Sequence, residues 1–119
     1  MQVVSVAEEI EKRIKLLTRT KEELRERTEA KANAIAEYEK RLAIVIIGLK
    51  NGKEFEIDGE KIQNPPATII EKVAKGVCWR EKLEMDKAET SYKSLITAIE
   101  CIKAELNGYQ SIYKHLDEK

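Results

Sequence analysis

The sequence lacks most of the features from which membrane anchors, metal sites and active sites are built. Its longest apolar run, residues 42–47, is far shorter than the ~20 residues needed to cross a bilayer, so we expect no membrane partner. His115 is the single histidine, and Asp117, two residues away, would point elsewhere on a helix. Cys78 and Cys101 are too far apart for a metal or redox pair and are typical of small core residues in a reducing compartment.

Motifs for catalysis are missing as well. The chain has no metal-ligand spacing, no glycine-rich phosphate loop and no nucleophile elbow. We therefore predict a protein that is not an enzyme, with no catalytic, cofactor-binding or metal site. No secretory leader is recognised, so we expect a cytoplasmic protein.

Charge of either sign is not in excess. Lys plus Arg and Asp plus Glu number 22 each, so the net charge is zero, and no overall field draws the protein toward nucleic acid or a membrane. Charged residues make up 37% of the chain and aromatic residues only 5%, a balance that is typical of long, exposed helices in a single domain.

Apolar or aromatic residues recur in the second half at alternating steps of three and four. Read backwards, the positions are Leu116, Tyr113, Tyr109, Leu106, Ile102, Ile99, Leu95, Tyr92, Ala88 and Met85. Such steps average about 3.5 residues and keep one stripe of a helix facing a partner helix. The pattern extends back through Glu81, Cys78 and Ala74, so we predict a helix over about 65–117, with Gly76 as a possible kink.

The first half carries a second stripe of the same period. Its positions are Val3, Ala7, Ile10, Ile14, Leu17, Leu24, Ile35, Tyr38, Leu42, Val45 and Leu49, interrupted by Lys21, Thr28 and Lys31. This pattern predicts a helix over about 5–48, with a break near residues 18–20 as the alternative. The β-branched segment 43–47 also suits a strand.

The connector, about 49–64, contains two turn signals. Asn51-Gly52 favours a tight turn, with residues 54–57 as the returning strand, and Asp58-Gly59 marks a second turn. We expect at most a short β-hairpin around Asn51-Gly52. Asn64 and Pro65 suit the start of the next helix.

Two long helices joined by a short connector must run antiparallel. The predicted fold is therefore all-α: residues 1–119 form one coiled-coil-like helical hairpin. Glu81 is expected to pair with Lys31 across it. Because two helices bury too little apolar surface for a stable domain, we expect a homo-oligomer, in the simplest case a dimer that forms a four-helix bundle.

Two surfaces are candidates for binding. The widest apolar face predicts self-association or capture of a protein partner, and its residues are Ile69, Ile70, Val73, Val77 and Trp79. The alternative for Trp79 is that it covers the loop end of its own hairpin. A local basic excess is the candidate for nucleic-acid contact, through Lys12, Arg13, Lys15, Arg19, Arg25 and Arg27, although a solvated helix face explains it as well.

Two segments of the chain carry a resemblance to known proteins. They are residues 64–79, Asn-Pro-Pro-Ala-Thr-Ile-Ile-Glu-Lys-Val-Ala-Lys-Gly-Val-Cys-Trp, and residues 103–113, Lys-Ala-Glu-Leu-Asn-Gly-Tyr-Gln-Ser-Ile-Tyr. They resemble small helical phage and prophage proteins of Gram-positive bacteria, which are often encoded in early gene blocks near recombination and single-strand-binding genes. The resemblance implies a viral accessory factor that acts by binding, in the host cytoplasm. It carries over no site residue.

Together these features predict a non-enzymatic helical interaction protein that binds a host or phage protein. The alternative is a nucleic-acid-binding accessory protein of phage recombination or replication that uses the basic residues between Lys12 and Arg27.

The stripe of the second helix makes a direct prediction. Ile99→Asp buries an unpaired carboxylate and should cost several kcal/mol, whereas Lys103→Asp, one turn along but off the stripe, should change stability by no more than about 0.5 kcal/mol. Thermal melts followed by circular dichroism measure the difference. Equal melting temperatures for the two variants would show that the stripe is misassigned.

Overall fold

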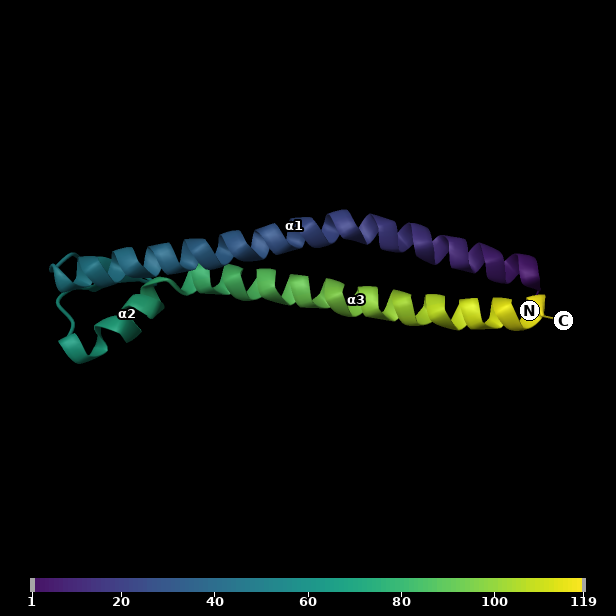
Figure 1. The fold of residues 1–119 in the computed structure, drawn as a ribbon. Helices are drawn as coiled ribbons and strands as arrows, with labels where there is room; N and C mark the ends of the chain where they lie inside the picture. Colours follow the sequence, from purple (N-terminus) through teal and green to yellow (C-terminus); the bar gives the residue numbers. More distant parts are fainter. Residues whose placement is uncertain (1, 119) are drawn as a thin grey trace. The chain divides into compact units, whose positions relative to one another are not determined.

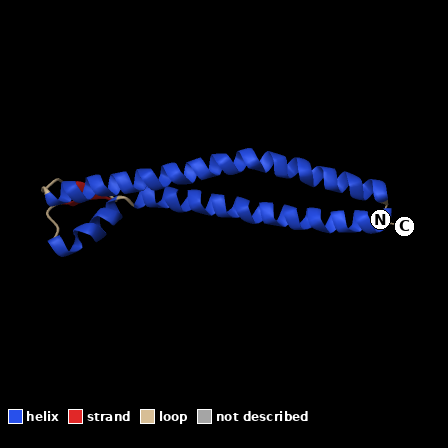
Figure 2. Cartoon of the chain, viewed as in Figure 1, coloured by secondary structure: helices blue, strands red, loops and turns tan. Residues whose placement is uncertain are grey.

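The computed structural model describes residues 2–118 and is dominated by two long helices (Figures 1 and 2). The elements are α1 (Val3–Lys50), β1 (Phe55–Ile57), β2 (Glu60–Ile62), the short 3-10 helix η1 (Ala67–Ile69), α2 (Ile70–Val77) and α3 (Trp79–Asp117). The predicted helical class is confirmed. Residues 18–20 and 43–47 are helical within α1, so neither the alternative break nor the alternative strand forms.

The chain divides into two compact units. The terminal unit combines α1 up to Thr28 with α3 from Thr90 onward, and the connector unit runs from Glu29 to Glu89. Each unit contains one segment of α1 and one of α3, and each has its own contacts.

In the terminal unit the two helix segments run antiparallel. Arg13 of α1 donates from Nε and Nη2 to Glu105 Oε2, at 3.1 and 2.9 Å. Further along α1, Arg27 Nη1 donates to the Ser91 carbonyl oxygen at 2.8 Å. Because the partner number falls as the α1 number rises, the segments pair as a hairpin requires.

The connector unit shows the same direction of pairing. Arg41 Nε lies 3.8 Å from Glu81 Oε1, and Lys82 Nζ lies 5.7 Å from the centre of the Tyr38 ring. The antiparallel helical hairpin predicted from the two stripes is therefore present in both units.

The α3 stripe is confirmed at nearly every position. Residues from Met85 to Tyr109 on this stripe are buried or half-buried, with Leu95 the most enclosed. Tyr113 is the exception, since it is 36% exposed. Steps of three and four therefore identified the packed face of α3 correctly.

In the first half of α1 the predicted stripe is right at Ile10, Leu17 and Leu24 and wrong by one residue at the alternate positions. Ala7, Ile14, Lys21 and Thr28 are exposed, and the positions that face α3 are Val6, Ile10, Arg13, Leu17, Thr20, Leu24 and Arg27. From Tyr38 to Leu49 the predicted positions are buried or half-buried. An undistorted helix has about 3.6 residues per turn, so a pattern with period 3.5 drifts around it over several turns.

A third layer completes the core of the connector unit. Val45, Leu49, Phe55, Ile70, Ala74 and Cys78 form one buried cluster, and Leu42, Ile46, Ile62, Val73 and Val77 pack against it. The cluster therefore joins α1, the β-strands, α2 and the residue that precedes α3.

The β-hairpin forms, but not around the turn that we predicted. β1 and β2 pair antiparallel with Ile57 opposite Glu60, so Asp58-Gly59 is the two-residue turn. Both turn residues have positive φ, 48° and 84°, as a type I′ turn requires.

Gly52 instead ends α1, with φ of 78°. The backbone N–H groups of Gly52 and Lys53 donate to the carbonyl oxygens of Leu49 and Gly48, at 3.2 and 2.9 Å. This is the Schellman arrangement, in which a glycine lets the chain reverse out of a helix. The Asn51-Gly52 signal was a helix stop rather than a hairpin turn.

The predicted helix over 65–117 is wrong in its first part. Asn64, at φ of 52°, and two prolines precede η1, and α2 and α3 are separate helices that meet at Cys78, whose φ and ψ are −91° and 22°. The kink suspected at Gly76 therefore lies two residues further on. At this break α2 packs on the β-hairpin while α3 continues along α1.

Two glycines provide a matched test of the packing between Phe55 and α1 in the connector unit. A Cβ at Gly48 would lie 2.7 Å from the Phe55 ring, whereas a Cβ at Gly108 would meet nothing within 4 Å beyond the adjacent backbone of α3. Gly48→Ala should therefore cost about 1–3 kcal/mol through overpacking. Gly108→Ala should stabilise α3 by about 0.5–1 kcal/mol.

Chemical denaturation of both variants measures these differences. A neutral or stabilising Gly48→Ala would show that Phe55 does not pack on α1 in solution.

Candidate functional site

The predicted apolar face of residues 69–79 is divided between core and surface. Ile70 is buried, and Val73 and Val77 are half-buried against the connector-unit core. Only Ile69 and Trp79 are exposed, each at 43%. Most of this face therefore packs against the hairpin of its own chain, and Ile69 and Trp79 are its exposed members.

Other apolar side chains of the connector unit do reach the surface. Ile44 and Ile47 on α1 are 46% and 60% exposed, and Leu83 on α3 is 43% exposed. Ile44 and Ile47 lie three residues apart, on the side of α1 away from the fully buried Val45. From the sequence, Ile44 and Ile47 can be recognised as exposed only after the positions of α1 that face the core have been identified.

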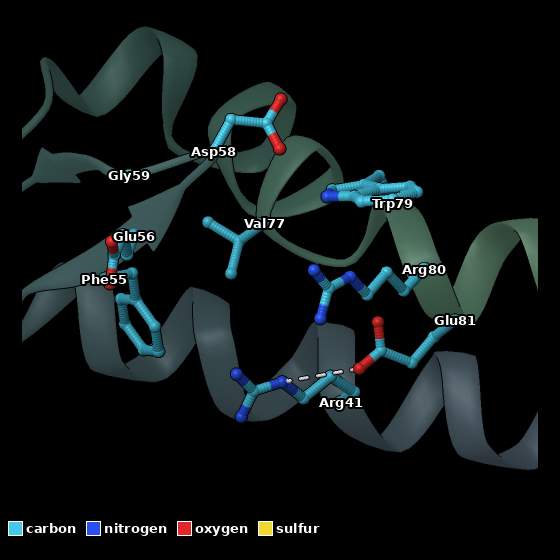
Figure 3. A pocket seen from close by; sticks show the side chains of 9 residues that line it. All are labelled: Arg41, Phe55, Glu56, Asp58, Gly59, Val77, Trp79, Arg80 and Glu81. Carbon is cyan, nitrogen blue, oxygen red and sulfur yellow. Dashed lines mark ion pairs between the residues drawn. The ribbon is translucent and has the colours of Figure 1, made fainter.

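A hollow of about 450 Å³ lies beside the break between α2 and α3. Its walls come from α1, β1, the Asp58-Gly59 turn, the end of α2 and the first turn of α3 (Figure 3). The lining residues are Arg41, Phe55, Glu56, Asp58, Gly59, Val77, Trp79, Arg80 and Glu81. The tight turn and the helix break together create this space.

Two arginines stack on aromatic walls at the hollow. The Arg80 guanidinium carbon lies 5.2 Å from the centre of the Trp79 ring, and that of Arg41 lies 5.9 Å from the centre of the Phe55 ring. Such cation–π contacts hold a guanidinium in place while leaving its N–H groups available.

The acidic partner in the hollow is Glu81. It forms an ion pair with Arg41 at 3.8 Å (dashed in Figure 3), whereas the sequence predicted an ion pair with Lys31. Arg41 lies ten residues further along α1 than Lys31. The distance exceeds that of a hydrogen bond, so the two groups hold each other loosely.

The predicted nucleic-acid residues of the terminal unit are largely engaged with acids. Lys12 and Arg13 both pair with Glu9, Lys15 pairs with Glu11, Arg25 with Glu22 and Arg27 with Glu23. Arg19 is exposed. The residues lie on several sides of α1, and Arg13 and Arg27 face α3, so they do not form a single basic strip.

Arg13 connects the two helices of the terminal unit. Besides its bonds to Glu9 and Glu105, its guanidinium lies 4.6 Å from the centre of the Tyr109 ring. Hydrogen bonds from Arg13 and Lys12 lower the pKa of the Glu9 carboxyl, and the bond to Glu105 raises the pKa of Arg13. Because the pKa of Glu9 is lowered on folding, its ion pairs stabilise the fold above the ordinary carboxyl pKa and are lost on acidification.

Cys78 and Cys101 differ in environment. Cys78 is fully buried in the connector-unit core and Cys101 is exposed on α3. Burial, with a further contribution from the Glu81 carboxylate, raises the pKa of the Cys78 thiol. A raised pKa and a closed environment both suppress the thiolate that reacts.

Across residues 2–118, no group of three His, Cys, Asp or Glu side chains is placed to hold a metal ion. In the same part of the chain, no helix is both long and apolar enough to cross a bilayer.

Comparison of the chain with protein-family models, with curated proteins and with solved structures finds no match in any of the three.

The two thiols provide a test of the connector-unit core. A disulfide exchange reagent should label Cys101 at once and Cys78 at least roughly 100-fold more slowly, since Cys78 reacts only when the core opens. The Cys101→Ser variant isolates the slow thiol, and denaturant should make it fast. Rapid labelling of both cysteines in the native protein would contradict the buried position of Cys78.

Proposed function

We propose that the chain is a non-enzymatic helical interaction protein that self-associates and binds a protein partner. The observation that carries this proposal is the set of apolar side chains that the connector unit leaves exposed: Ile44, Ile47, Ile69, Trp79 and Leu83. Exposed apolar groups that lie together, as Ile44 and Ile47 do on one side of α1, are typical of interaction surfaces.

The exposed area supports association with a second copy. The chain exposes 8557 Å², whereas a folded monomer of 13.7 kDa exposes about 6,600 Å². The excess of about 2,000 Å² is more than each partner contributes to a standard protein–protein interface. Zero net charge means that two copies approach without long-range repulsion.

The outer side of α1 at Ile44 and Ile47 is the proposed contact between copies. Both side chains point away from the hairpin core, so pairing two copies there covers apolar surface without disturbing Val45 or Leu49. A dimer of hairpins joined in this way brings four helices together and adds the burial that a lone hairpin lacks.

The alternative function, a nucleic-acid-binding accessory protein, has weaker support. Most cations of the basic segment already pair with acids of the same helix. Phosphate binding would have to replace these pairs, which reduces the gain from counterion release.

We place this function in a phage or prophage accessory factor that acts in the host cytoplasm. This setting rests on the resemblance of residues 64–79 and 103–113 to small helical phage proteins. The genes beside it provide the test: recombination or single-strand-binding genes are expected, and a bacterial operon without phage genes would contradict the setting.

Sedimentation equilibrium at micromolar concentration tests the self-association. The expected mass is at least twice 13.7 kDa, and Ile47→Asp should raise the dissociation constant at least about tenfold, because it places a charge at the centre of the contact. Ile14→Asp is the matched control, since Ile14 is exposed to a similar extent in the terminal unit.

A monomeric mass with full helical circular dichroism would overturn self-association. An equal effect of Ile14→Asp and Ile47→Asp would show that the contact lies elsewhere.

A further inference from the structure

We propose that the hollow at the start of α3 binds a single acidic side chain, Glu or Asp, from a protein partner, with Arg41 and Arg80 holding the carboxylate. This inference rests on the proposed function as a protein-binding factor and names the chemistry that such a partner presents.

The first reason is convergence of like charges. Figure 3 shows the guanidinium groups of Arg41 and Arg80 directed into the same space, although they come from different helices. Two cations brought together repel each other, and an anion between them removes that repulsion. The fold therefore leaves a place where a negative group is stabilised.

The second reason is that Arg80 has no acidic partner of its own, although the lining of the hollow also contains carboxylates. Among residues 2–118, Arg80 makes no ion pair, and the ion pair of Arg41 with Glu81 is 3.8 Å long. A carboxylate from outside can approach Arg80 directly, and it can form the paired, coplanar hydrogen bonds for which guanidinium groups are suited.

The third reason is the shape and polarity of the walls. Trp79 and Phe55 flank the arginines and provide apolar surface for the methylene groups of Glu or Asp. The volume of about 450 Å³ exceeds what one carboxylate fills, so the residues next to the acid in a peptide also fit. Trp and Arg together are the residue types that dominate binding energy at interfaces.

The acidic residues of the rim limit the ligand. Figure 3 shows the Asp58 carboxylate pointing away from the two guanidinium groups, on the opposite rim of the hollow. With Glu56 and Glu81, the lining holds three carboxylates beside its two guanidinium groups, so a ligand that carries negative charge alone is repelled. The site therefore selects one carboxylate with a basic residue next to it, whose charge the lining acids attract, over phosphate or nucleic acid.

Trp79 is the only tryptophan, so its fluorescence reports directly on the hollow. The probe is acetyl-Ala-Glu-Lys-Ala-amide, and the same peptide with Gln in place of Glu is its neutral control. The acidic peptide should change the fluorescence saturably, whereas the Gln peptide and inorganic phosphate at equal concentration should not.

Two substitutions should act in opposite directions. Arg80→Gln should raise the half-saturation concentration at least about tenfold, because it removes the cation without an ion pair. Glu81→Gln should lower it about threefold or more, since it removes the competing carboxylate. Arg25→Gln, an arginine in a surface pair with Glu22, is the matched control and should leave it unchanged. Circular dichroism and slow labelling of Cys78 show that each variant is folded.

The proposal is overturned if the Gln peptide or phosphate binds as well as the acidic peptide. It is also overturned if Arg80→Gln has no larger effect than Arg25→Gln. Failure here is distinguishable from failure of self-association: a wild-type dimer without peptide binding rejects the hollow alone, whereas a monomer that binds the peptide rejects self-association alone.

Discussion

The structure depends on one constraint: two paired helices can cover only one stripe of each other. A residue on that stripe loses contact with water on one side, while its flanks stay hydrated. For this reason most stripe positions of the terminal unit are half-buried and only Val6, Thr20 and Leu95 are buried. Long amphipathic side chains suit such positions, because the stem packs while the charged end reaches a partner or water.

This explains why polar residues face α3 in the terminal unit. The Thr20 hydroxyl donates a hydrogen bond to the Leu17 carbonyl oxygen at 2.7 Å. Arg13 and Arg27 donate hydrogen bonds to acceptors on α3. These bonds favour one alignment of the two helices, since sliding by one turn would separate each donor from its acceptor. Leucine at the same positions would bury more area but fix the alignment less firmly.

The connector unit buries more of its side chains than two helices alone could, because a further layer packs on them. The β-hairpin and α2 cover the end of the hairpin, so Val45, Ala74 and Cys78 lose all contact with solvent. The same addition has a geometric consequence: α2 follows the β-strands whereas α3 follows α1, and the chain must bend between them at Cys78. The bend brings Trp79, Arg80 and Glu81 to the edge of the β-turn, and the hollow is the space that remains.

Much of this arrangement could be predicted from the sequence, and the failures have physical causes. The α3 stripe was found because its apolar residues are nearly continuous, whereas the α1 stripe was misplaced because Ile14 is apolar but exposed, and Arg13 is charged but packed. A turn signal such as Asn51-Gly52 gives positive φ without saying whether a helix ends or a hairpin begins. The break at Cys78 has no local signal, since its cause is the β-hairpin that α2 covers.

The hollow could not be found from the sequence for a related reason. Arg41 and Arg80 are 39 positions apart, and in a chain with 37% charged residues neither stands out. Arg80 of α3 makes no ion pair among the described residues, as is also true of Arg19, whereas Arg13, Arg25, Arg27 and Arg41 of α1 pair with acids. Abundant opposite charges neutralise each other along regular helices, where neighbours recur every three or four residues. At the break between α2 and α3 that regular spacing is interrupted, and a cation is left facing a space that a partner can enter.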